Sequence, residues 1–133
     1  MRLTRRYRFS ASHRLDVAGL SPDENQRLFG KCNNPYGHGH DYVLDVTLEG
    51  APDESGQIAR RDELDSFVTN KVVERLDHRN LNLDVAELSN RPPTTENLAD
   101  AVGKMLKQEW PFRARLARVR ISETDRNIFE LES

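Results

Sequence analysis

Apolar and polar residues alternate along the chain in two early segments. From Leu3 to His13 the odd positions carry most of the apolar side chains, and from Tyr42 to Leu48 the even positions do. A period of two is typical of strands with one buried face. The pattern therefore predicts one strand over about 3–13 and a second that ends near residue 50. Between them, residues 16–26 are rich in Gly, Pro, Asp and Asn, which predicts a loop.

Two later segments have the three- and four-residue spacing of helices. Apolar residues in 61–76 form one stripe, which predicts a helix that ends at Leu76. A second predicted helix opens after two prolines, with Thr94 as its N-cap and Glu96 in its first turn, and it is closed by Pro111.

Two final strands are predicted over 117–124 and 127–131. The order strand, strand, helix, helix, strand, strand predicts one α+β domain over residues 1–133. Its antiparallel four-stranded sheet would carry two helices on one face.

Composition narrows the possible functions. The chain has 22 acidic and 20 basic residues, so it lacks the basic excess of most nucleic-acid-binding proteins. No apolar run is long enough to span a membrane, and the first residues lack the apolar core of a secretory leader. Cys32 is the one cysteine, which excludes an intrachain disulfide and fits a reducing compartment. We expect a cytoplasmic protein with no nucleic-acid or membrane partner.

Three of the four histidines share the buried parity of the two early strands. His13 ends the first strand, and His38 and His40 begin the second. A single buried histidine is usually a hydrogen-bonded core residue, but three would each need a partner, whereas one zinc ion satisfies all three. Three histidines with an open fourth position is the pattern of catalytic zinc. Zinc is the preferred ion by ligand type, although imidazole also suits other divalent metals.

Other polar residues allow more than one interpretation. Cys32 is an inert buried thiol, a fourth ligand that closes the metal site, or a thiolate favoured by the nearby ion. The adjacent pair Asp77 and His78 is either exposed loop polarity or a proton relay in which the carboxylate orients the imidazole. Glu123 shares the buried parity of the third long strand. It either reaches solvent or an arginine at the strand end, or accepts two parallel N–H donors from a ligand.

Five blocks of this sequence carry a recognisable pattern, namely 9–15, 32–40, 76–81, 94–97 and 123–127. Together they resemble the signature of the 6-pyruvoyl-tetrahydropterin synthase family, which includes the 6-carboxy-tetrahydropterin synthases of queuosine biosynthesis. The resemblance covers nearly the whole chain. It implies the tunnelling fold (T-fold), in which subunits form trimers around a continuous β-barrel and trimers pair into hexamers, with active sites at subunit interfaces.

The resemblance also implies roles for individual residues. His13, His38 and His40 match the zinc ligands of the family. Cys32 matches its catalytic base, and Asp77 with His78 match the rest of the catalytic set. Glu123 matches the carboxylate that anchors the pterin ring, while Thr94, Thr95 and Glu96 fall where the family contacts the pterin.

The implied activity is a zinc-dependent lyase reaction on 7,8-dihydroneopterin triphosphate with loss of triphosphate. No nicotinamide or flavin is needed, because the redox change is internal to the substrate. The five residues between Cys32 and His38 resemble the pyruvoyl-forming branch of the family. The alternatives are the 6-carboxy product from the same substrate and, outside enzymes, a zinc-stabilised structural oligomer in which Cys32 completes the coordination.

Overall fold

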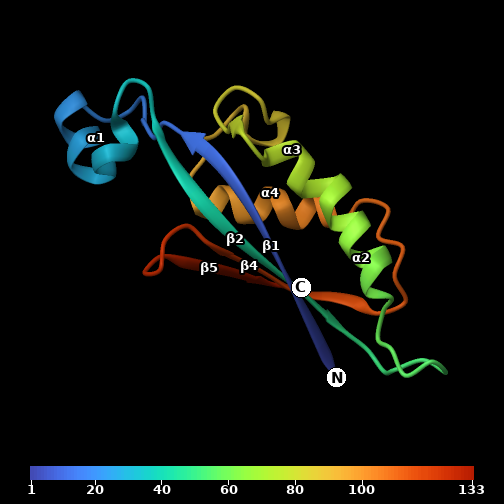
Figure 1. Ribbon diagram of the computed structural model, residues 1–133. Coiled ribbons are helices and arrows are strands. Elements are labelled where there is room, and N and C mark those ends of the chain that lie inside the picture. The colour runs from blue at the N-terminus through green and yellow to red at the C-terminus, as the bar shows by residue number, and fades with distance from the viewer.

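The computed structural model describes residues 1–133 and contains one mixed sheet with helices on one of its faces (Figure 1). The α+β class is therefore confirmed. The strands are β1 (Arg2–His13), β2 (His38–Glu49), β3 (Arg79–Asn80), β4 (Arg115–Ser122) and β5 (Ile128–Glu132). The helical segments are α1 (Pro22–Phe29), η1 (Gly30–Asn33), α2 (Arg61–Val68), η2 (Thr69–Val73), α3 (Glu74–Leu76), η3 (Ala86–Leu88) and α4 (Thr95–Lys107).

The sheet has five strands in the order β3-β1-β2-β4-β5, so the prediction of four was wrong. β1 and β2 form a long antiparallel ladder that ends where His13 pairs with His38. The extra strand, β3, pairs in parallel with β1 at residues 11 and 12. Two residues are too few to show an alternating pattern, which is why the sequence gives no sign of this strand.

The predicted loop over 16–26 was also partly wrong, because α1 begins inside it. Ser21 caps this helix, since its side chain accepts from the Glu24 N–H while the Glu24 carboxylate accepts from the Ser21 N–H. Pro22 occupies the first turn, where its missing N–H costs nothing. Asn25 is the one buried residue of α1, so the helix has no apolar stripe to reveal it.

The predicted helix over 61–76 is continuous, but its middle is a π-helical turn. Leu64, Val68, Val72 and Leu76 recur every four residues and are all fully buried. A spacing of four drifts around an α-helix, in which 3.6 residues make one turn. The wider turn η2 offsets part of that drift and keeps all four side chains toward the sheet.

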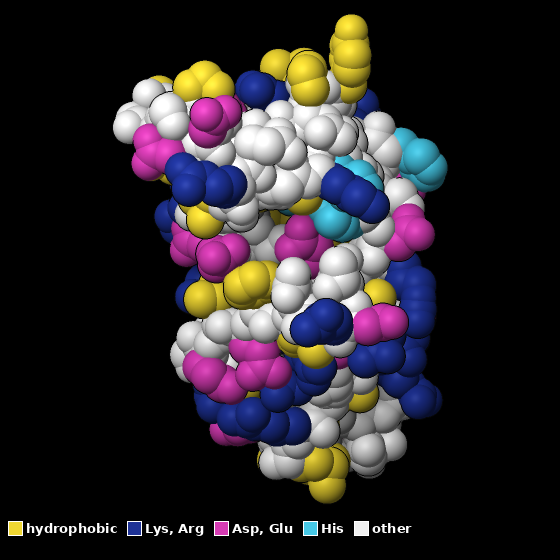
Figure 2. All heavy atoms as spheres, turned by 90° about the vertical axis from the view of Figure 1, so that its left-hand side faces the viewer, with side chains coloured by type: hydrophobic (Ala, Val, Ile, Leu, Met, Phe, Trp, Pro, Cys, Tyr) yellow, Lys and Arg dark blue, Asp and Glu magenta, His cyan; other side chains and the backbone are white.

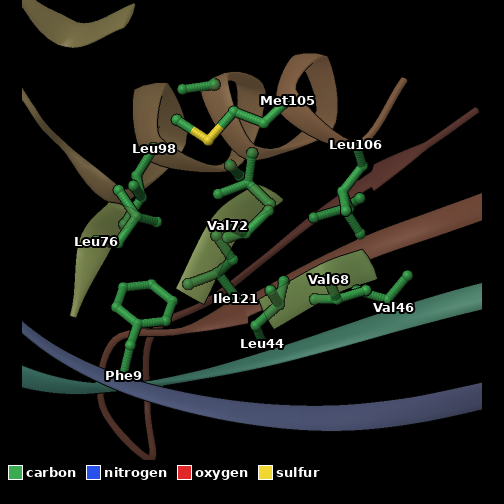
Figure 3. Packing of buried hydrophobic residues seen from close by; sticks show 14 of the residues in the cluster. Phe9, Leu44, Val46, Val68, Val72, Leu76, Leu98, Met105, Leu106 and Ile121 are labelled. Carbon is green, nitrogen blue, oxygen red and sulfur yellow. The ribbon is translucent and has the colours of Figure 1, made fainter. Parts of the chain in front are cut away.

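The core lies between the helices and one face of the sheet. Figure 3 shows Phe9, Leu44 and Ile121 from the sheet facing Val72 and Leu98 from the helices. Twenty-three buried residues form this cluster. His13 and His40 follow the same inward parity at the end of the ladder, so the core face leads directly to the candidate site. None of the helices is long and apolar enough to cross a membrane.

Candidate functional site

Four side chains bring potential metal-ligand atoms together at one end of the sheet. They are His13, Cys32, His40 and Glu123, and their ligand atoms all lie within 4.8 Å of one another. His13 Nε2 is 3.2 Å from His40 Nε2, and Cys32 Sγ is 3.3 Å and 3.6 Å from these two nitrogens. Glu123 Oε1 lies 3.1 Å from His40 Nε2 and 3.8 Å from His13 Nε2. We call this group the four-residue cluster.

The ladder between β1 and β2 places the two histidines. His40 pairs with Ala11, so its side chain and that of His13 lie on the same inward face. His13 is almost fully buried, and its Nδ1 donates to the Pro93 carbonyl oxygen at 2.8 Å. That hydrogen bond assigns the ring proton to Nδ1 and leaves Nε2 with a free lone pair directed at the cluster.

A glycine is required at the turn into β2. Gly37 has φ +79°, and a Cβ on it would lie 2.6 Å from the His13 carbonyl oxygen. The chain therefore passes the end of β1 more closely than any residue with a side chain allows. This approach keeps the start of β2 in register with His13.

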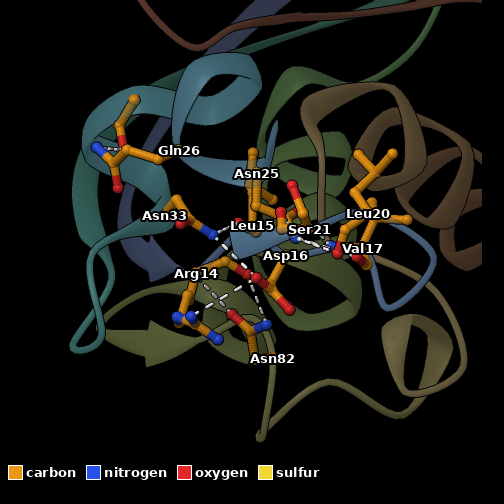
Figure 4. Close-up of polar contacts among 11 residues, drawn as sticks. Arg14, Leu15, Asp16, Val17, Leu20, Ser21, Asn25, Gln26, Asn33 and Asn82 are labelled. Atoms are coloured by element: carbon orange, nitrogen blue, oxygen red, sulfur yellow. Dashed lines mark hydrogen bonds and ion pairs between the residues drawn. The ribbon is translucent and has the colours of Figure 1, made fainter. Parts of the chain in front are cut away.

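Polar contacts join the segment after β1 to the helical segment that contains Cys32, and Figure 4 shows Leu15, Asp16 and Asn33 among them. The Leu15 N–H donates to the Cys32 carbonyl oxygen at 2.7 Å. The Asn33 side chain donates to the Leu15 carbonyl oxygen at 2.7 Å and to the Asp16 carboxylate at 3.1 Å. Buried Asn25 likewise accepts from the Val17 N–H and donates to the Val17 carbonyl oxygen. The segment after β1 and the segment with Cys32 are thus one hydrogen-bonded unit.

Burial sets the protonation of the cluster. It lowers the pKa of both the His13 and His40 rings, which favours neutral imidazoles that can act as ligands. It raises the pKa of the Cys32 thiol, and the Glu123 charge raises it further. A bound cation would reverse this shift, because a positive charge stabilises the thiolate.

The cluster fits a zinc ion by donor type and by spacing. Zinc bonds to imidazole nitrogen at about 2.0–2.1 Å, so two nitrogens of a tetrahedral site lie roughly 3.3 Å apart. His13 Nε2 and His40 Nε2 are 3.2 Å apart, and the two sulfur–nitrogen distances are 3.3 and 3.6 Å. Imidazole, thiolate and carboxylate are all zinc donors.

The remaining predicted ligand and the Asp-His pair lie beside the cluster. His38 adds no ligand atom to it, and its ring stands edge-on to the His40 ring with centroids 4.8 Å apart. Asp77 accepts from the Ser10 N–H at 2.9 Å and lies 3.0 Å from His78 Nδ1. His78 has φ +58° and an exposed side chain. Its N–H donates to the Ser10 carbonyl oxygen, so the backbone of Ser10 holds both residues of the pair.

An open cavity lies beside His40 of the cluster and His78 of the Asp-His pair. Its volume is about 530 Å³, and both His40 and His78 line it. Figure 2 shows histidine side chains reaching the surface near one end of the molecule, with acidic side chains nearby. The cavity is large enough for a small organic ligand. Its other lining residues are Ser10, Ala11, Ser12, Gly39, Asp41, Arg79, Asn80 and Asp84.

The start of α4 borders the cluster through Pro93. Thr94 caps the helix as predicted, since its side chain accepts from the Asn97 N–H. Thr95 is buried and Glu96 is exposed. The sequence reasoning missed Ser10 and Pro93, which hold site residues through their backbones. A backbone contact leaves no residue-type signal, although the two prolines before the cap do mark a fixed loop.

Comparison with known proteins gives consistent results. A family model described as 6-pyruvoyl tetrahydropterin synthase matches residues 2–133. The 6-pyruvoyl tetrahydrobiopterin synthases of Drosophila melanogaster and Homo sapiens are each 42% identical over 127 residues, which is 95% of this chain and 76% and 87% of those proteins. A structure of the Caenorhabditis elegans 6-pyruvoyl tetrahydropterin synthase superposes with a TM-score of 0.91 at 38% identity and covers 100% of this chain and 95% of that one.

Proposed function

This chain belongs to the 6-pyruvoyl tetrahydropterin synthase family, and from that premise we propose that it is a zinc-dependent lyase acting on 7,8-dihydroneopterin triphosphate. The observation that carries the proposal is the convergence of His13, Cys32, His40 and Glu123 beside a cavity, in a chain similar to synthases along almost its whole length. The product would be 6-pyruvoyl-tetrahydropterin, with inorganic triphosphate as the leaving group.

The reaction balances within the substrate. Triphosphate leaves the terminal side-chain carbon, the two hydroxyl-bearing carbons become carbonyls, and the ring C6=N5 bond is reduced. Protons taken from carbon are returned to carbon and nitrogen of the same molecule. The protein therefore has to move protons and stabilise charge, and it needs no external oxidant or reductant.

The residues divide this work between them. When bound, a zinc ion supplies Lewis acidity to the substrate hydroxyls. Cys32, which lies against both cluster histidines, is the proposed base for the carbon-bound proton. Asp77 is kept ionised because the Ser10 N–H and then His78 lower the pKa of its carboxyl, and it orients the His78 ring as a proton relay.

Substrate recognition is assigned to carboxylates and hydroxyls near the cluster. Glu123, which is largely buried, would accept from the pterin ring, and Thr94, Thr95 and Glu96 at the start of α4 would contact the same ring. His38 remains a proposed zinc ligand because it adjoins His40 on the inward face. A small rotation of the His38 ring would add a third imidazole to the proposed zinc ligands.

The chain is also proposed to work as a homo-oligomer, with trimers closing a β-barrel and pairing into hexamers. The support is an unpaired edge at β5, where Ile128 and Leu131 expose 42% and 38% of their surface. Open strand edges with apolar side chains favour pairing with another chain. Light scattering on the purified protein would give the number of subunits.

Product analysis tests the proposed activity. Purified protein is incubated with 7,8-dihydroneopterin triphosphate, and mass spectrometry identifies the pterin formed. The 6-pyruvoyl product supports the proposal, whereas the 6-carboxy product or no turnover contradicts it. A zinc-containing oligomer without turnover would favour a purely structural ion.

The Cys32→Ala variant tests the role of the thiol. If Cys32 is the base, the variant keeps its metal but loses turnover, because the histidines still hold the ion. Loss of metal together with turnover would instead make Cys32 a ligand. His38→Ala is the companion variant, and its metal content shows whether His38 binds the ion.

A further inference from the structure

Arg79 is the one lysine or arginine that lines the cavity beside the Asp-His pair. It belongs to β3, the two-residue strand at one edge of the sheet. Hydrogen bonds on either side fix its backbone. The His78 N–H donates to the Ser10 carbonyl oxygen at 2.6 Å, and the Leu81 N–H donates to the Ser12 carbonyl oxygen at 2.8 Å. The sheet therefore sets the position of Arg79 at the cavity.

The Arg79 guanidinium has no carboxylate partner within the chain. Most arginines of this protein have one, including the neighbouring Arg75, which lies 2.6 Å from Glu87. The Arg79 side chain is exposed and forms neither an ion pair nor a hydrogen bond. A guanidinium stays charged at every pH a protein meets, so its charge at this cavity is available to an anionic ligand.

Two further hydrogen-bond donors line the same cavity. Ser12 pairs with Asn80 across the ladder between β1 and β3. The Asn80 side-chain oxygen accepts from the Asn82 N–H at 2.9 Å, which orients the amide and leaves its NH2 group free to donate. The Ser12 hydroxyl is also free to donate. A guanidinium, an amide and a hydroxyl thus line one cavity from adjacent positions of two paired strands.

Apart from the histidines, the other titratable side chains at the cavity are the carboxylates of Asp41 and Asp84. Asp41 accepts from the Ser10 hydroxyl at 2.5 Å. Asp84 accepts from the Asn80 N–H at 2.9 Å. Both carboxylates repel an anion, so an anion depends on the Arg79 guanidinium for its counter-charge. Guanidinium groups bind phosphate oxygens through two parallel N–H donors, which makes a phosphate group the best match.

We propose that Arg79, together with Ser12 and Asn80, binds the phosphate groups of a phosphorylated substrate. The identity of that substrate as 7,8-dihydroneopterin triphosphate rests on the proposed function, whereas anion binding by Arg79 does not. Arg79 thereby selects phosphorylated over unphosphorylated ligands. His40 and His78 line the same cavity, so the phosphate groups are held beside the residues proposed to act on the rest of the molecule.

Calorimetric titration with inorganic triphosphate tests anion binding without any pterin. Excess magnesium is present throughout, so that the triphosphate does not extract the metal of the protein. Arg79→Ala should bind triphosphate roughly ten- to a hundredfold more weakly than wild type, because it loses a charged hydrogen-bond donor. Arg79→Lys should lie between them, since it keeps the charge but loses the paired donors. Equal affinities of wild type and Arg79→Ala, or no binding by wild type, would overturn the proposal.

The pterin ligands give the second measurement. With 7,8-dihydroneopterin triphosphate, Arg79→Ala should raise KM by a similar factor and change kcat little, because a contact to the phosphates is lost in the ground state and the transition state alike. Unphosphorylated 7,8-dihydroneopterin, followed by fluorescence, should bind both proteins equally. An equal loss for both ligands would contradict a phosphate contact. If wild type binds inorganic triphosphate but does not convert the pterin, the proposed function fails and the anion site stands.

Arg61→Ala is the matched control. Arg61 is also exposed and also without an ion pair, but it begins α2 and lines a cavity with Met1 and Arg2 at the opposite end of β1. Its loss should leave triphosphate affinity unchanged, and an effect equal to that of Arg79→Ala would show only general attraction of charge, against the proposal. Arg79→Ala should unfold at the wild-type temperature, because its side chain has no partner to lose. An earlier unfolding would show that the guanidinium is already bonded within the chain, which contradicts its availability to a ligand.

Discussion

Gly37→Ala should destabilise the protein and weaken metal binding through one backbone contact. At φ +79° an alanine pays about 1–2 kcal/mol for the left-handed conformation. Its Cβ would also lie 2.6 Å from the His13 carbonyl oxygen and 3.0 Å from the carbonyl carbon. Both neighbours are backbone atoms, so the end of β1 itself must shift. Overpacking of this kind costs typically about 1–3 kcal/mol.

Gly56→Ala separates the two effects. Gly56 has φ +82°, and nothing lies within 4 Å of the position of its Cβ. Both alanines share the strain at positive φ and the reduced entropy of the unfolded chain, so the difference between them measures the contact with His13. That difference is about 1–3 kcal/mol. For a domain of this size it corresponds to roughly 3–12 °C in Tm.

The assay is thermal unfolding of both variants together with their zinc content. Gly37→Ala should melt below Gly56→Ala and retain less zinc, because metal ligands tolerate displacements of only about 0.2 Å. Equal melting temperatures and equal zinc contents would show that the turn before β2 does not control the position of His13.

Two further predictions concern carboxylates. Asp77→Asn should lower turnover by roughly 10²-fold with unchanged metal content, because the neutral amide cannot stabilise a protonated His78; a loss of zinc instead would show that Asp77 supports the metal site. Arg5 and then Tyr7 lower the pKa of the Asp65 carboxyl in the folded protein. The stability from this interaction is present above about pH 4 and is lost as the pH falls through the folded pKa. Metal-free Asp65→Asn should therefore lose less stability between pH 5 and pH 2 than wild type, as measured by denaturant unfolding, and an equal loss would contradict this account.

Most of what the sequence predicted about the fold came from the alternation of apolar and polar residues along the strands. The alternation around Phe9 and Leu44 identified both long strands and their inward faces, which the register between β1 and β2 shows directly. Thr94 was identified as a cap because its side chain acts on a neighbouring N–H, a purely local interaction. The missed elements depend on other information. β3 is a strand because it pairs with β1, and two residues carry no pattern of their own. For α1 the available sequence signal was the Ser21–Glu24 capping box, which the prediction of a loop did not use.

The sequence predicted the kind of site, a histidine-rich metal site, better than it predicted how the side chains are arranged. Parity placed His13, His38 and His40 on one face, yet it could not tell which rings converge. That choice depends on the turn at Gly37 and on the Pro93 carbonyl, both of which are backbone features. Parity also marked Glu123 as inward, but its approach to His40 required the register of β4 against β2.

The ladder between β1 and β2 continues past the end of β4, and the histidines lie in that extension. β4 pairs with residues 43–49 of β2, so residues 38–42 have only β1 beside them on that sheet. The two-residue strand β3 adds a third strand to this ribbon of β1 and β2 at residues 11 and 12 alone. A ribbon of two strands is marginally stable by itself. An ion bound there would stabilise the part of the sheet that has the fewest neighbouring strands. Release of the ion should therefore appear first as faster amide hydrogen exchange in this ribbon, while the amides near Val46 stay protected.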